Sequence, residues 1–120
     1  MMGAVRVARV YDVDAGDEAV KILVDRLWPR GVRKDDARID EWCPEVAPST
    51  ELRRWYGHRP EVFAEFSERY RDELDGEDGR AALAHVRELA EGRSVVLLTA
   101  TRDVEHSQAT VLAEVLSDLP

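Results

Sequence analysis

Cysteine is almost absent from this sequence, which has a single one, Cys43, among its 120 residues. One cysteine cannot form an internal disulfide, so we expect a reducing compartment and a cytoplasmic location. Apolar runs are short, and none approaches the roughly 20 residues that cross a membrane. Residues 1–6 lack the long apolar segment of a signal peptide. We therefore expect no membrane association.

Motifs that hold metals and cofactors are also missing. The three histidines, His58, His85 and His106, form neither an HxxxH nor an HExxH pattern, and there is no paired-cysteine spacing. There is no glycine-rich phosphate loop of the Walker or Rossmann type and no G-x-S-x-G nucleophile motif. We therefore expect neither a metal site nor a bound cofactor.

Positive charge is scarce and unevenly placed. The chain has 17 basic and 25 acidic residues, a formal net charge of -8, which argues against extended nucleic-acid binding. Residues 61–91 hold four basic and ten acidic side chains, whereas residues 20–59 hold nine basic and seven acidic ones. Arginine outnumbers lysine 15 to 2. The guanidinium groups of the mildly basic segment suit carboxylate or phosphate ligands.

Hydrophobic patterning predicts an α/β fold. Residues 5–10 alternate apolar and polar side chains, which is typical of a half-buried strand, and residues 22–24 and 94–99 read as buried strands. Helices are predicted from Asp35 or Asp36 to Cys43, over 49–57, from Pro60 to 74, over 83–90 after a turn at 76–79, and from Asp103 onward. We expect one domain spanning residues 1–120, with about three largely parallel strands covered by helices.

Polar residues follow each predicted strand, where ligands bind in open α/β sheets. Tyr11 follows the first strand. The other candidates are Asp25, Arg26 and Arg30 after the second strand, and Thr99, Arg102 and His106 at the end of the third. If the strands are parallel, these three groups converge on one edge of the sheet.

Each candidate has a structural alternative. Arg26 and Arg30 flank the turn at 28–31 and form either an anion clamp or structural ion pairs. Asp25 is either a general base or a group that orients a neighbouring arginine. His106, expected in the first turn of the last helix, either transfers a proton or is a hydrogen-bonded surface residue.

The chain resembles the YeaO-like branch of the domain-of-unknown-function family 488. Residues 24–31 read VDRLWPRG, residues 47–58 read APSTELRRWYGH, and residues 66–74 carry the pattern Phe-x-x-Arg-Tyr-x-x-Glu-Leu, each of which resembles a family block. Residues 97–100 with Asp103 and His106 are similar to the C-terminal block. The resemblance implies an α/β domain in a bacterial or archaeal cytoplasm, with no established activity.

The resemblance also marks candidate site residues without assigning their roles. The matching positions are Asp25, Arg26, Pro29, Arg30, Ser49, Thr50, His58, Arg69, Tyr70 and His106. Family members commonly place asparagine after the C-terminal histidine, or the triplet Cys-His-Arg in longer chains, whereas this chain reads Glu105-His106-Ser107. That difference argues against cysteine chemistry or metal binding at this point.

Three functional hypotheses remain open. The first is a small hydrolase or group transferase acting on an anionic ligand such as a nucleotide, with Asp25 and His106 catalytic and the ligand held by Arg26 and Arg30. Thr99, Arg102, Tyr11, His58, Ser49 and Thr50 are further ligand-binding candidates. The second is a non-catalytic module that binds a small anion or nucleotide. The third is a protein-interaction domain that uses the acidic segment 61–91; the oligomeric state stays open.

Overall fold

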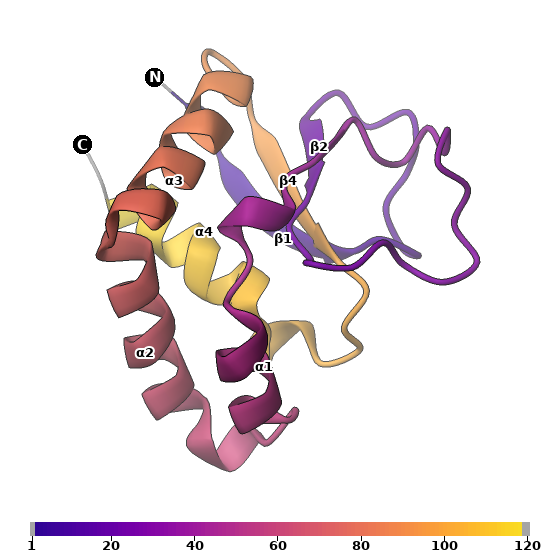
Figure 1. Cartoon of the computed structure of the whole chain (residues 1–120). Helices are drawn as coiled ribbons and strands as arrows, with labels where there is room; N and C mark the ends of the chain where they lie inside the picture. The colour runs from indigo at the N-terminus through magenta and orange to yellow at the C-terminus, as the bar shows by residue number, and fades with distance from the viewer. Residues whose placement is uncertain (1, 119–120) are drawn as a thin grey trace.

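A four-stranded parallel sheet organises residues 2–118, which the computed structural model describes (Figure 1). The strand order is β1-β4-β2-β3. The strands are β1 (Val5–Arg9), β2 (Val20–Leu23), β3 (Glu41–Trp42) and β4 (Val95–Thr99). Every neighbouring pair is parallel, which confirms the predicted α/β class. The described sheet has one strand more than the three expected from the sequence.

The strand at the centre of the sheet is the most apolar one. All five residues of β4 are buried, and they pair with β1 on one side and β2 on the other. A strand covered on both faces has no solvent face to place polar residues on, which explains its continuous apolar run. β1 lies at one end of the strand order and is only half-buried, in agreement with the alternating pattern of residues 5–10.

The helices pack on one face of the sheet and loops cover the other (Figure 1). The α-helices are α1 (Thr50–Tyr56), α2 (Phe63–Asp75), α3 (Glu77–Leu89) and α4 (Gln108–Asp118). Short 3-10 turns are η1 (Pro44–Val46), η2 (Pro60–Val62) and η3 (Val104–His106). No helix within residues 2–118 is long and apolar enough to cross a membrane.

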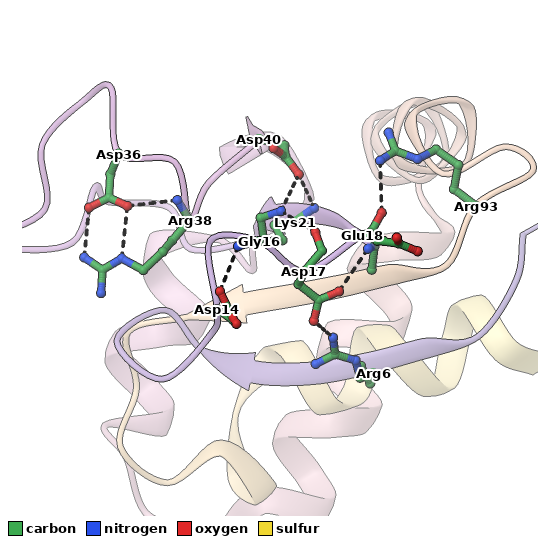
Figure 2. Close-up of polar contacts among 11 residues, drawn as sticks. Arg6, Asp14, Gly16, Asp17, Glu18, Lys21, Asp36, Arg38, Asp40 and Arg93 are labelled. Carbon is green, nitrogen blue, oxygen red and sulfur yellow. Dashed lines mark hydrogen bonds and ion pairs between the residues drawn. The ribbon is translucent and has the colours of Figure 1, made fainter.

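The face opposite the helices is closed by residues 10–19 and 24–40. Leu23, Val96 and Leu98 point to this side and pack with Trp28 and Trp42. Figure 2 shows ion pairs that hold the covering loops: Arg6 with Asp17, Lys21 with Asp40, and Arg38 with Asp36. The basic groups on this side of the molecule are thus largely matched by carboxylates.

The predicted helix from Asp35 or Asp36 to Cys43 is wrong. This segment forms loop and then β3, whose residues continue the sheet beside β2. Trp42 packs with the loop-side cluster and Cys43 with the helix-side cluster, so successive side chains point to opposite faces. That period of two is the period of a strand. Trp42 and Cys43 follow Ile39 by three and four residues, a spacing that also occurs on one face of a helix and explains the wrong prediction.

Two helix boundaries also differ from prediction. Pro60 begins the 3-10 turn η2, and the α-helix starts three residues later at Phe63. Gly79 lies inside α3 rather than in the turn before it, because α2 and α3 meet closely there. A Cβ at Gly79 would approach the carbonyl oxygen of Glu73 to 2.4 Å and Cα of Leu74 to 2.5 Å. The glycine is therefore required by packing.

Cys43 should be unreactive in the folded protein. Its side chain is 2% exposed, and burial raises the pKa of the thiol from 9.0 to about 11. The thiolate is the reactive form, and two pKa units lower its fraction roughly a hundredfold. We expect Cys43 to react with Ellman's reagent at least that much more slowly in the native protein than in urea. Equal rates in the two conditions would contradict the buried position of Cys43.

Candidate functional site

A cleft of about 740 Å³ opens at the carboxyl ends of β2 and β4. It lies between the loop that follows β2, the helix α1, and the segment that joins β4 to α4. Its lining residues are Asp25, Arg26, Leu27, Trp28, Pro29, Arg30, Ala47, Pro48, Thr50, Arg53, Arg54, Tyr56, His58, Phe66, Ala100, Thr101, His106, Ser107 and Gln108. The position agrees with the general rule for ligand sites in open parallel sheets.

The parallel sheet brings several of the predicted site residues together and leaves others outside. Those that line the cleft are Asp25, Arg26, Arg30, Thr50, His58 and His106. Those that do not line it are Tyr11, Ser49, Thr99 and Arg102. Tyr11 is nevertheless close by, because its hydroxyl donates to the carbonyl oxygen of Arg30 at 3.0 Å. Arg102 is exposed on the segment after β4.

Ser49 serves the helix rather than the cleft. Its Oγ accepts a hydrogen bond from the backbone N–H of Leu52 at 3.1 Å, which makes Ser49 the N-cap of α1, at the start of the helix predicted over residues 49–57. The same hydroxyl donates to Oε2 of Glu73 at 2.6 Å, and the Ser49 N–H donates to Oε1 at 2.8 Å. Ser49 thus joins the start of α1 to α2. Gly57, with φ of 53°, ends α1 in the left-handed conformation as predicted.

Asp25 links three elements at the base of the cleft. Its Oδ2 accepts from the backbone N–H of Ala100 at 2.8 Å, and its Oδ1 accepts from Nε2 of Gln108 at 2.5 Å. The carboxylate therefore ties the end of β2 to the end of β4 and to the first residue of α4. Burial raises the pKa of Asp25, although hydrogen bonds from Ala100, Thr99 and Gln108 partly oppose the rise. Both oxygens already have partners.

Arg26 also makes hydrogen bonds that connect two segments of the chain. Its Nε donates to the carbonyl oxygen of Pro48 at 3.1 Å, and Nη2 donates to that of Ala47 at 3.0 Å. These carbonyls belong to the segment that enters α1. Arg26 therefore positions α1 beside the loop after β2, and it also lines the cleft. The anion clamp of Arg26 and Arg30 stays a prediction.

Arg53 and Arg54 are cleft residues that the sequence reasoning missed. Thr50, Arg53 and Arg54 have the spacing i, i+3, i+4, which places them on one face of α1. The sequence could have indicated this shared face, because the helix was predicted over residues 49–57 and α1 lies within those bounds. Within residues 2–118, Arg30, Arg53 and Arg54 form no hydrogen bond or ion pair through their side chains, unlike Arg26. The charge of Arg53 does lower the pKa of Asp25 somewhat.

His106 lies in η3, one turn before α4 begins, and not in the first turn of α4 as predicted. Ser107 alone separates it from Gln108, the first residue of α4. Its Nδ1 lies 2.8 Å from Oδ2 of Asp103, and its ring meets Phe63 edge-on with centroids 5.3 Å apart. Asp103 makes no side-chain cap bond, because its carboxylate is directed to His106 instead.

The three tryptophans lie in two separate places. Trp28 and Trp42 meet edge to face at 5.4 Å, and Nζ of Lys34 lies 4.6 and 5.0 Å from their ring centroids. Trp55 is separate and packs against Arg59 and Arg69. Of the three, Trp28 alone lines the cleft. A planar ligand would therefore find little free aromatic surface there.

Fold and cleft together define a small parallel α/β protein with an arginine-rich cleft at the carboxyl edge of its sheet. Residues 4–119 match the family described as the inactive DUF488-N3 subclade, and the chain belongs to that family. The predicted resemblance to the YeaO-like branch is confirmed.

Three similar curated proteins each cover nearly the whole chain. An uncharacterised protein of Mycobacterium tuberculosis strain H37Rv is 55% identical over 114 residues, covering 94% of this chain and 93% of the relative. An uncharacterised protein of Mycobacterium bovis shows the same values. The uncharacterised protein YeaO of Escherichia coli strain K12 is 37% identical over 111 residues, covering 92% and 95%. No solved structure matches the chain.

Removing the Asp25 carboxylate should destabilise the protein more than replacing it with an amide. Asp25→Ala leaves the Ala100 N–H and the Gln108 amide without their acceptor, and we expect a loss of about 2–3 kcal/mol. In Asp25→Asn the new oxygen accepts from Ala100, and Gln108 can turn its amide to accept from the new N–H group. We expect a loss of about 1 kcal/mol, measured by urea unfolding. Equal stability of all three proteins would rule out the linking role.

The stability difference between the native protein and Asp25→Asn should also depend on pH. Because burial raises the pKa of Asp25, the folded state keeps its proton at pH values where the unfolded chain has already lost it. The free energy of unfolding of the native protein, relative to that of Asp25→Asn, is therefore greatest below pH 3.8. This difference falls as the pH rises toward the raised pKa of Asp25 and is constant above it. Urea unfolding of both proteins across this range measures the trend; an advantage that grows with pH would contradict the pKa shift.

Proposed function

We propose that this protein is a non-catalytic receptor for a small anion, bound in the cleft. The observation that carries the proposal is the charge of the lining in a chain of net charge -8. The cleft holds four arginines and two histidines against one carboxylate, Asp25. That carboxylate is hydrogen bonded through both oxygens. One carboxylate balances only one of the four guanidinium charges, so an anion from solution would complete the charge of the cleft.

Three of the four cleft arginines have no side-chain hydrogen-bond or ion-pair partner among residues 2–118, whereas several arginines elsewhere on the surface are paired. Arg38 pairs with Asp36 at 2.8 Å, and Arg71 pairs with Glu114 at 3.0 Å. Acidic side chains outnumber basic ones by eight, so partners are plentiful on most of the surface. Keeping several guanidinium groups together without partners is electrostatically unfavourable, and an anion would relieve this repulsion.

Binding without catalysis is favoured over hydrolysis or group transfer for two reasons. The description of the family as inactive agrees with it. In addition, the two oxygens of Asp25 are occupied by structural hydrogen bonds, which makes it a poor general base. Asp25 thus fits the structural alternative of the sequence prediction better than the catalytic one.

One contact supports the enzymatic alternative. The Asp103 carboxylate lies 2.8 Å from Nδ1 of His106, and an imidazole oriented by a carboxylate is the usual arrangement of a histidine general base. His106 also lines the cleft. The enzyme hypothesis therefore rests on the pair of Asp103 and His106. If the protein turns over a bound anion and His106→Ala abolishes that turnover, the protein is an enzyme and not a receptor.

A charge-matched pair of triple variants tests the anion site. Arg30, Arg53 and Arg54 are replaced by alanine in one protein, and the exposed Arg33, Arg80 and Arg93 in the other, so that both lose three positive charges outside the core. Thermal shift and calorimetry with phosphate, pyrophosphate and citrate provide the readout. We expect the cleft variant to lose binding by about a hundredfold or more, because each charge-assisted hydrogen bond contributes about 1.5–3 kcal/mol.

The control variant should bind within about threefold of the native protein, since it retains the cleft and alters only the long-range charge. If no anion binds the native protein at millimolar concentration, the proposal fails. Equal losses in both triple variants would also overturn it, because binding would then depend on net charge and not on the cleft.

A further inference from the structure

We propose that the ligand carries two linked anionic groups and bridges two separate walls of the cleft. This inference rests on the proposed anion-receptor function and specifies the ligand. The loop wall is residues 26–30, which carry Arg30. The helix wall is the face of α1 that carries Thr50, Arg53 and Arg54. The loop wall presents one unpaired guanidinium group and the helix wall two, and the two walls come from segments 24 residues apart in sequence (26 to 50).

The backbone of the loop wall is fixed, although the side chain of Arg30 is exposed. The Tyr11 hydroxyl donates to the carbonyl oxygen of Arg30 at 3.0 Å, and Nε1 of Trp28 donates to that of Val32 at 2.7 Å. Gly31 has φ of 75°, a value that favours glycine, so the bend after Arg30 suits this residue. A fixed backbone presents Arg30 to a ligand with little loss of loop entropy.

The helix wall is held at both of its ends. Ser49 caps α1 and binds Glu73 of α2, while the Tyr56 hydroxyl donates to the carbonyl oxygen of His106 at 2.7 Å. Arg26 connects the two walls, because its guanidinium donates to the carbonyls of Ala47 and Pro48 just before α1. The separation of the walls is therefore set by hydrogen bonds within the protein and does not need a ligand to define it.

The size and charge of the cleft exceed what one simple anion can satisfy. A cleft of about 740 Å³ lies in the range of about 300–1,000 Å³ that holds organic ligands of many atoms. One phosphate or carboxylate can engage one wall fully and leaves the guanidinium groups of the other wall unpaired. A ligand with two anionic groups pairs both walls at once, and its second group binds as an intramolecular step.

Two chemical sources supply such a ligand: a diphosphate, free or attached to a nucleoside, and a dicarboxylate or tricarboxylate. The guanidinium fork binds both types of oxygen pair. Tyr56 and Phe66 also line the cleft, but both are buried and stack on each other at 4.2 Å. The linked anions, and not an attached ring, therefore define the proposed ligand.

Calorimetric titration of the native protein compares phosphate with pyrophosphate, and acetate with citrate. We expect at least one linked anion to bind about tenfold or more tightly than its simple counterpart. A titration with adenosine diphosphate, compared with pyrophosphate, shows whether an attached nucleoside adds affinity. A larger gain from phosphate to pyrophosphate than from acetate to citrate identifies a diphosphate ligand, and the reverse identifies a carboxylate ligand.

Two wall variants then test the bridging. Arg30→Ala removes the free arginine of the loop wall, and the double variant Arg53→Ala/Arg54→Ala removes those of the helix wall. Either one should remove the advantage of the linked anion over the simple anion. Arg30→Ala should change the affinity for the simple anion by less than about threefold, because the helix wall with two arginines remains. The exposed Arg80→Ala, on α3 and outside the cleft, is the matched control and should leave both affinities unchanged.

The outcomes separate this inference from the function on which it rests. If phosphate and pyrophosphate bind equally well, and acetate and citrate likewise, the cleft is an anion site but the two-wall ligand is wrong. If only one wall variant reduces the advantage of the linked anion, the bridging geometry is also wrong. If none of these anions binds, both proposals fail together.

Discussion

The Asp25 carboxylate is the contact on which the rest of the site depends. It accepts hydrogen bonds from the Ala100 N–H at the end of β4 and from Gln108 at the start of α4, so it holds together the strand ends that frame the cleft. Burying a carboxylate is costly, and the raised pKa of Asp25 reflects that cost. The parallel sheet places these groups within reach, because the ends of β2 and β4 lie at the same edge.

The distribution of charge follows a division between the two sides of the molecule. On the loop side, ion pairs such as Arg38 with Asp36 neutralise basic groups locally (Figure 2). At the cleft, the one lining carboxylate is committed to backbone and amide donors, and Arg30, Arg53 and Arg54 receive no acidic partner among residues 2–118. An acidic total charge and a locally basic cleft are therefore compatible. The total describes the surface as a whole, whereas a ligand responds to the groups within about a Debye length of its position.

Much of this arrangement could be predicted from the sequence, where the physical signal was local. The apolar run at 94–99 identified the central strand, and Ser49 with Gly57 bounded α1 correctly. The polar groups after β2 and β4 met at one edge because the strands are parallel, a condition that the sequence left open. The loop-side position of Trp42 could not be predicted, since short apolar spacings fit a helix and a strand equally well until the partner strand is known.

The roles of the site residues were the hardest part to predict, because a role depends on partners far away in sequence. Asp25 and Gln108 are 83 residues apart, and Arg26 reaches carbonyls more than 20 residues later. Residue type alone marked Asp25 and Arg26 as chemical groups, but their hydrogen bonds are those of structural links. Arg53 and Arg54 looked like ordinary surface residues of a helix, and they become site candidates because α1 turns that face toward the loop after β2. In this fold the motif residues Asp25 and Arg26 build the cleft through hydrogen bonds. Arg30, Arg53 and Arg54, which lie in the same two motifs, supply its free charge.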